Sequence, residues 1–292
     1  MKKIQTLLST LEKIHPRLAS KAAYQLFCFP PRPEILGETN HLVTEAKKIF
    51  DQAVEVSVKS GSFRLKAYHF RGSNSANSVT PKKKVLVIHG WTSASFYMAR
   101  VIQTLIDENY EVVAFDFPAH GRSSGKFASF LEAVPAILKM GERFGPFDLA
   151  VGHSFGSAML LYAIEGGSPF HKAFSVKKMI LFSPPEDISG VIDRFSAAAG
   201  LSPRLRIAFR SRIEKIVKRP LKEICGADFL KVTGIPTYLV HDRHDLEIPF
   251  TESLKLQSAG GFVTLYETEG LGHRDILIDE ISLGHLREAI RI

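Results

Sequence analysis

One short stretch near the middle of the chain constrains the fold more than any other, because a strand must turn sharply into a helix there. The apolar run 149–151 leads into Gly152-His153-Ser154-Phe155-Gly156, and a second apolar run follows and stops at Gly166-Gly167. Glycines two residues before and after the serine permit a tight turn, because a side chain at either glycine would collide with the neighbouring backbone. Such a turn exposes the Ser154 hydroxyl, and the start of the following helix favours negative charge beside it.

Continuous apolar runs alternate with helical patterns from residue 84 onward. This pattern is typical of parallel strands that are covered by helices on both faces, so it predicts an α/β fold. Strands are expected at 84–89, 111–116, 148–152, 178–183, 236–241 and 262–268. Helices are expected near 95–109, 127–143, 155–165, 251–258 and 275–291. Strict alternation of apolar and polar residues over 54–58 and 63–70 predicts an antiparallel hairpin ahead of these strands.

Two segments fall outside this alternation. Residues 1–50 are interpreted as an N-terminal helical arm packed on the main domain, with two short helices separated near Pro16, a Pro-rich linker over 29–33 and a further short helix from 43 to 53. Lysines beside the first apolar stripe leave a membrane-surface helix as the alternative. Residues 185–235 are interpreted as helices inserted between strands, so the core comprises residues 51–184 and 236–292.

Composition narrows the class of protein. With 292 residues and 45% hydrophobic residues, the chain suits one large domain with an insertion. No apolar run approaches the roughly 20 residues that span a bilayer, and no cleavable leader is visible, so a cytoplasmic protein is expected. Cys28 and Cys225 lie in no CxxC spacing, which predicts neither a disulfide framework nor a zinc site. No cofactor or metal is expected.

The net charge of +8 raises the question of an acidic partner. Apart from residues 82–84 and 204–222, the basic residues are scattered and no aromatic residues interleave with them, so nucleic acid is not expected as a partner. We interpret 204–222 as a solvated helix face, with admission of anionic substrates as the alternative. His241 and His244 have no third ligand at a suitable spacing, which argues against a metal site.

Functional groups gather at the carboxyl ends of the strands in an open parallel sheet. Four such loops carry suitable residues here: 89–92, the turn at Ser154, 242–249 and 270–273. A serine hydroxyl needs an imidazole to take its proton, and the imidazole needs a carboxylate to fix its tautomer. The sequence therefore predicts Ser154 as nucleophile, His273 as general base and then general acid, and Asp245 as the orienting carboxylate.

The backbone amides of Trp91 and Phe155 are the predicted oxyanion donors. His89 and His120 are expected to have structural roles in their loops, and Asp116 to anchor a turn by accepting hydrogen bonds from nearby amides. His153 and Phe155 flank the serine and are expected to line its pocket.

These motifs together resemble the α/β-hydrolase family. The residues that carry the resemblance are His89-Gly90-Trp91, Asp116 to Ser123, Gly152 to Gly156, Asp245 to Pro249 and Gly272-His273. The resemblance implies an eight-stranded sheet with a helical lid at 185–235 over the serine. The family's acid usually lies in Gly-x-x-Asp-x-x-Val-Pro, whereas this chain has Asp242 at the glycine and Ile248 at the valine. Asp242 and Glu247 therefore stay as alternative acids.

The predicted function is a serine hydrolase that cleaves a small-molecule carboxylic ester or thioester through an acyl-enzyme intermediate. A serine at the turn argues against members of the family that attack through aspartate. Two alternatives stay open: a non-catalytic member of the fold that acts as a binding module, and an acyltransferase with the same triad. The sequence gives no indication of the oligomeric state.

Overall fold

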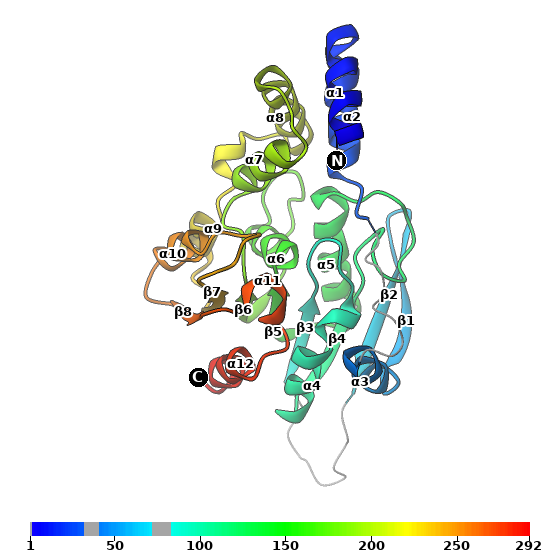
Figure 1. The fold of residues 1–292 in the computed structure, drawn as a ribbon. Helices are drawn as coiled ribbons and strands as arrows, with labels where there is room; N and C mark the ends of the chain where they lie inside the picture. Colours follow the sequence, from blue (N-terminus) through cyan, green and yellow to red (C-terminus); the bar gives the residue numbers. More distant parts are fainter. Residues whose placement is uncertain (1, 32–40, 72–82) are drawn as a thin grey trace.

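The computed structural model describes residues 2–31, 41–71 and 83–292, which form one eight-stranded sheet in the order β1-β2-β4-β3-β5-β6-β7-β8 (Figure 1). The hairpin β1–β2 is antiparallel, β2 also pairs antiparallel with β4, and the remaining pairs are parallel. The predicted α/β fold with a mostly parallel sheet is confirmed. The strands are β1 (Val54–Ser60), β2 (Phe63–Phe70), β3 (Lys84–Ile88), β4 (Glu111–Phe115), β5 (Phe147–His153), β6 (Val176–Phe182), β7 (Thr237–Asp242) and β8 (Val263–Thr268).

Helices cover both faces of the sheet. Alternate residues of β3 enter different cores: Leu86 and Ile88 pack with α5 and α6, whereas Val85 and Val87 pack with α3, α4 and α12. This two-sided burial explains why the strands read as continuous apolar runs. The helices are α1 (Lys2–Ile14), α2 (Pro16–Phe27), α3 (His41–Phe50), η1 (Ser95–Met98), α4 (Ala99–Asp107), α5 (Phe130–Phe144), α6 (Phe155–Glu165), α7 (Ile188–Ala198), α8 (Pro203–Val217), η2 (Leu221–Glu223), α9 (Gly226–Thr233), α10 (Thr251–Gln257), α11 (Gly272–Asp275) and α12 (Glu280–Arg291).

The closing helix differs from the expectation of one element over 275–291. It is divided into α11 and α12, because the Asp279 side chain accepts a hydrogen bond from the Ile281 amide and starts a new helix. Gly272 takes a positive φ of 62° at the first residue of α11. This break places His273 on a separate helical turn directly after β8.

The N-terminal arm (residues 1–50) divides between two parts of the molecule. Helix α3 packs on the core, while α1 and α2 pack on the insertion (residues 185–235), beside α7 and α8 (Figure 1). Ser202 donates a hydrogen bond to the Glu12 carboxylate (2.6 Å), and Ser20 donates to the Ala208 carbonyl (3.1 Å). The expectation that the arm packs on the main domain is therefore incomplete for its first two helices. They pack mainly on the insertion, and the end of α2 also bonds to the core, where the Ala128 amide donates to the Cys28 carbonyl (2.9 Å).

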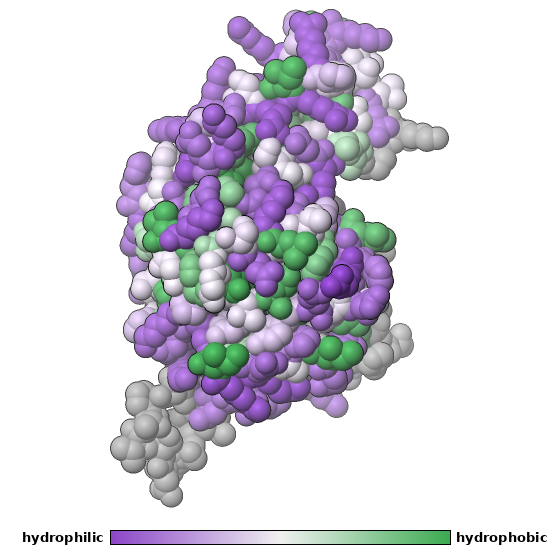
Figure 2. Space-filling view, turned by 90° about the vertical axis from the view of Figure 1, so that its left-hand side faces the viewer, coloured by the Kyte–Doolittle hydropathy of each residue, from purple (hydrophilic) through white to green (hydrophobic). Residues whose placement is uncertain are grey.

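The surface of the arm and the insertion is largely hydrophilic at the top of the space-filling view (Figure 2). The predicted linker beyond residue 31 and most of the loop after β2 lie outside the described residues. Within the described ranges, no helix combines the length and apolar content that crossing a membrane requires.

Candidate active site

The turn at Ser154 joins β5 to α6 in a conformation that constrains both flanking glycines. Ser154 itself has φ +51° and ψ −119°, a backbone conformation that residues other than glycine rarely adopt. A Cβ added at Gly152 would lie 2.9 Å from the Ser157 backbone, and one added at Gly156 would lie 2.5 Å from the His89 carbonyl oxygen. Both distances are below contact range, so the close approach predicted from the glycine spacing is present.

The Ser154 hydroxyl does not stabilise this turn. Its amide donates to the Phe182 carbonyl (2.9 Å), but its side chain does not cap α6, and the residue is 9% exposed. Ser154 lines a cavity of about 610 Å³ together with Trp91 and Phe155. The hydroxyl is therefore available to a molecule in that cavity.

The two residues predicted to supply oxyanion donors both lie close to this serine. A Cβ added at Gly90 would lie 3.3 Å from the Ser154 Cβ, so the turn after β3 passes directly beside the serine. The Trp91 and Phe155 rings pack edge to face with centroids 5.0 Å apart. Within the described part of the chain, neither backbone amide of this pair donates to a protein group. Both amides are thus free to bind an oxygen of a ligand.

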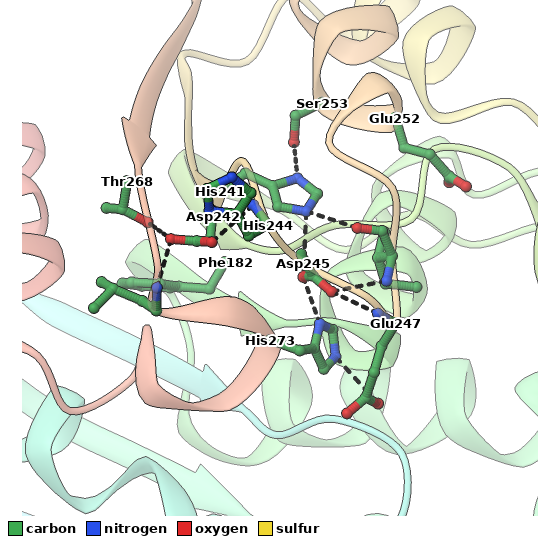
Figure 3. Close-up of polar contacts among 12 residues, drawn as sticks. Phe182, His241, Asp242, His244, Asp245, Glu247, Glu252, Ser253, Thr268 and His273 are labelled. Atoms are coloured by element: carbon green, nitrogen blue, oxygen red, sulfur yellow. Dashed lines mark hydrogen bonds and ion pairs between the residues drawn. The ribbon is translucent and has the colours of Figure 1, made fainter.

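His273 and Asp245 are brought together by the loops after β8 and β7. Asp245 Oδ2 lies 2.7 Å from His273 Nδ1, and Asp245 Oδ1 accepts hydrogen bonds from the amides of Glu247 (2.8 Å) and Ile248 (2.9 Å) (Figure 3). Burial by itself raises the pKa of the Asp245 carboxyl. Hydrogen bonds from His241, His273 and the Ile248 amide outweigh that effect and hold the pKa well below its usual range. Asp245 is therefore ionised beside His273.

The two alternative acids contact other groups. Asp242 accepts hydrogen bonds from the Thr268 hydroxyl and the Leu271 amide (both 2.9 Å), so it ties the loop after β7 to the loop after β8. Glu247 pairs with Arg274, and its Oε2 lies 3.9 Å from His273 Nε2 (Figure 3). Of the three carboxylates in this loop, Asp245 is the one that contacts Nδ1 of His273.

The connection between His273 and the serine turn runs through His153. His153 Nε2 lies 2.9 Å from the His273 carbonyl oxygen, which can only accept, so this nitrogen carries the hydrogen. The two rings are 4.8 Å apart. No hydrogen bond between His273 Nε2 and Ser154 Oγ is present in the described chain, and such catalytic hydrogen bonds are often long before substrate binds. His153 does not line the cavity, contrary to the expectation, because its ring is turned toward His273.

His241 supports Asp245 and was missed as a site residue by the sequence reasoning, which considered it only as a metal ligand. Its Nε2 lies 3.3 Å from Asp245 Oδ2 and 3.1 Å from the Ile248 carbonyl, and its Nδ1 lies 2.7 Å from the Ser253 hydroxyl (Figure 3). The available signal was a histidine at the carboxyl end of an apolar strand. The described residues contain no group of three or more His, Cys, Asp or Glu side chains that could hold a metal ion.

Three further buried groups hold the loops in place. His89 accepts a hydrogen bond from the Phe117 amide (3.0 Å), and Asp116 accepts from the amides of Ser95 and Arg122 (both 2.8 Å), which are the roles expected from the sequence. Burial lowers the pKa of His89 to about 4. The pKa of His120 is lowered to about 3, mainly by burial and secondarily by the nearby His89.

Comparisons with known proteins agree with this architecture. A sequence profile described as the alpha/beta hydrolase family matches residues 85–280. Among solved structures, the chain is similar to the Pyrococcus furiosus esterase Pf2001 (22% identity, TM-score 0.58, 90% of this chain and 96% of that chain covered). It is also similar to a thioesterase domain from the curacin biosynthetic pathway (20% identity, TM-score 0.57, 82% and 99% covered).

A third solved structure, Est1E from Butyrivibrio proteoclasticus with ferulic acid bound, is 18% identical with a TM-score of 0.58, and 81% of this chain and 100% of that chain are covered. At these identities the likeness shows the fold that the chains share. No curated protein sequence matches the chain.

Proposed function

Because the chain belongs to the alpha/beta hydrolase family, we propose that it is a serine hydrolase that cleaves a small-molecule carboxylic ester or thioester through an acyl-enzyme intermediate. Esterases and a thioesterase domain among the similar structures are consistent with this class of reaction. The insertion would act as a lid over the serine.

The proposed reaction uses three side chains and two amides. His273 Nε2 takes the proton of Ser154 as Oγ attacks the acyl carbon, and the Trp91 and Phe155 amides hold the oxygen that becomes negative. Asp245 keeps the Nδ1 proton in place and stabilises the imidazolium. His273 then protonates the departing alcohol or thiol, leaving the acyl group on Ser154, and a water molecule activated by His273 releases the acid.

The observation that carries this proposal is the 2.7 Å contact between His273 Nδ1 and an ionised Asp245, together with a serine at the turn after β5 whose side chain does not cap α6. A histidine that only capped a helix would not need a buried carboxylate on Nδ1. The free amides close to the serine support the same chemistry.

The test is the Ser154→Ala variant assayed with p-nitrophenyl acetate and with a fluorophosphonate probe. We expect kcat/KM to fall by at least about 10³-fold and labelling to vanish, because the triad acts as a unit. Ser157→Ala is the matched control: Ser157 is buried in the first turn of α6, its hydroxyl donates a long hydrogen bond of 3.4 Å to the Phe182 carbonyl, and the variant should keep both activities.

Three outcomes would contradict the proposal. Unchanged turnover by Ser154→Ala would exclude Ser154 as the nucleophile. A folded wild-type protein that neither turns over esters nor reacts with the probe would favour the binding module, and product formed only with an added alcohol or amine would favour acyl transfer.

A further inference from the structure

The cavity beside Ser154 is lined by residues of the core, the insertion and the arm, which are distant in sequence. Helix α6 supplies Met159, the insertion supplies Val191 and Phe195, and the arm supplies Leu26, Phe27 and Phe29. At about 610 Å³ the cavity lies within the range of sites that hold a whole small ligand, so it is larger than an acetyl group needs. The arm lies outside residues 85–280, the region that matches the family profile.

The arm is fixed in this position by aromatic and backbone contacts. The Phe27 ring packs edge to face against Phe195 (centroids 5.0 Å apart) and against Phe209 of α8 (5.7 Å). The Ala128 amide donates to the Cys28 carbonyl (2.9 Å), which joins the end of α2 to the core. Helix α2 therefore bridges the insertion and the core at the edge of the cavity.

A second aromatic pair lies where the arm leaves the cavity. Phe29 of the arm and Phe127 of the core have ring centroids 5.6 Å apart and are 45% and 50% exposed. Because Phe29 also lines the cavity, it contacts both the interior and the solvent. Replacing it disturbs the cavity wall with little effect on the buried core.

The charges of the side chains that line the cavity disfavour anionic acyl groups. Among the described residues that line the cavity, the acidic or basic side chains are Glu186 and Asp187, and no cationic side chain is present. Glu186 is 6% exposed and accepts a hydrogen bond from the Cys225 thiol (2.5 Å), and burial raises its pKa. An anionic acyl group would lose its hydration here without gaining a positive partner.

The basic residues of 204–222 do not compensate, because none of them lines the cavity. Arg210 pairs with Asp193, Arg212 donates to Ser20, and Arg219 pairs with Glu165. Anionic substrates, the alternative that the sequence left open for this stretch, therefore find no cation in the cavity.

We propose that the arm forms one wall of an acyl-binding chamber, that Phe27 and Phe29 help to set which acyl chains reach Ser154, and that the chamber accepts uncharged, hydrophobic acyl groups. The inference rests on the proposed function, since it takes Ser154 as the acylated residue. It adds a specificity role for a segment outside the matched family region.

The first experiment measures kcat/KM of the wild-type protein for p-nitrophenyl esters from acetate to dodecanoate. Each added methylene that is fully buried in the chamber should raise kcat/KM about fourfold. Octanoate has six more methylenes than acetate, so it should exceed acetate by at least about 100-fold if about four of them are buried. The half-ester of succinate, which ends in a carboxylate, should react at least tenfold more slowly than butyrate, which has the same number of carbons. A flat profile, or a succinate half-ester that matches butyrate, would overturn the inference.

The second experiment compares the octanoate-to-acetate ratio of kcat/KM among variants of the arm. We expect Phe27→Ala to lower this ratio about tenfold and Phe29→Ala to lower it at least threefold. Leu18→Ala is the control, because Leu18 is exposed on the same helix and does not line the cavity, and it should keep the wild-type ratio. Phe29→Ala serves as the second variant if Phe27→Ala does not fold.

The outcomes separate this inference from the proposed function. If acetate is hydrolysed in a Ser154-dependent manner but folded Phe27→Ala and Phe29→Ala keep the wild-type ratio, only the role of the arm is overturned. If the wild-type protein hydrolyses none of the esters and does not react with the fluorophosphonate probe, the proposed function and this inference are both overturned.

Discussion

Replacing Asp245 with asparagine tests the site most sharply, because the loop around it dictates which way the new amide must face. Asp245 Oδ1 accepts two backbone amides, from Glu247 and Ile248, so the asparagine oxygen must stay on that side. The NH₂ group then faces His273 Nδ1, where the carboxylate oxygen was 2.7 Å away. An NH₂ group only donates, so Nδ1 must become the acceptor and the proton must move to Nε2.

This change of tautomer removes the base without removing the histidine. An Nε2 that already carries a proton cannot accept one from Ser154, and we expect Asp245→Asn to lower kcat by about 10⁴-fold, as in a Ser-His-Asp triad. That factor corresponds to about 5 kcal/mol of transition-state free energy. KM should change much less, since Asp245 does not line the cavity.

Asp242→Asn is the matched control from the same loop. Asp242 bonds to Thr268, to Leu271 and to the His244 amide rather than to His273, so its loss should cost about 1–3 kcal/mol of unfolding free energy and less than tenfold in kcat. The assay is kcat and KM for p-nitrophenyl acetate at pH 8, with urea unfolding of both variants.

Asp245 is not the orienting carboxylate if Asp245→Asn keeps more than a tenth of the wild-type kcat while Asp242→Asn loses most of it. If Asp245→Asn keeps its activity and Glu247→Gln loses most of it, Glu247 is the acid. Glu247 is the alternative because its Oε2 lies 3.9 Å from His273 Nε2.

Two further predictions concern stability. Ser154→Gly should be more stable than Ser154→Ala by about 1 kcal/mol in urea unfolding, because φ +51° suits glycine, and equal stabilities would show that the turn is unstrained. Burial holds the pKa of His89 near 4 and those of His120 and His153 near 3. The unfolded chain takes up these protons near pH 6.5, so the stability that they contribute is complete above that pH and is lost on acidification toward the folded values. Between pH 6 and pH 5, wild type should lose about 1 kcal/mol more unfolding free energy than His120→Gln, and parallel pH curves would contradict this assignment.

Most strands of the sheet could be predicted from the sequence. Both faces of the parallel strands are buried, so these strands are continuous apolar runs. The same topology brings the carboxyl ends of β3, β5, β7 and β8 to one edge, which is why Trp91, Ser154, Asp245 and His273 could be proposed together. The order of the strands depends on pairings between distant segments, so it could not be predicted from the sequence of any single strand.

The packing of the arm could not be predicted for a similar reason. Its apolar spacing predicts a helix with one buried face, and α2 does bury Ala19 and Ala23. The spacing does not specify the partner of that face. The contacts that join the arm to its partner are aromatic and polar, such as Phe27 with Phe195 and Ser202 with Glu12, between residues more than 160 positions apart.

The five buried histidines at this edge of the sheet show what sequence alone cannot decide. His89 and His241 have both ring nitrogens in hydrogen bonds to protein groups. His120 and His153 each use one nitrogen on a backbone carbonyl, and the other nitrogen is buried without a partner among the described residues. His273 differs from all four: its Nδ1 has the closest carboxylate contact of the group, and its Nε2 makes no hydrogen bond within the described chain. A general base needs one nitrogen that is held and one that is free to exchange a proton, and a carboxylate on the held nitrogen stabilises the imidazolium. His273 combines a carboxylate contact at Nδ1 with an unbonded Nε2, whereas the held nitrogens of His120 and His153 contact backbone carbonyls.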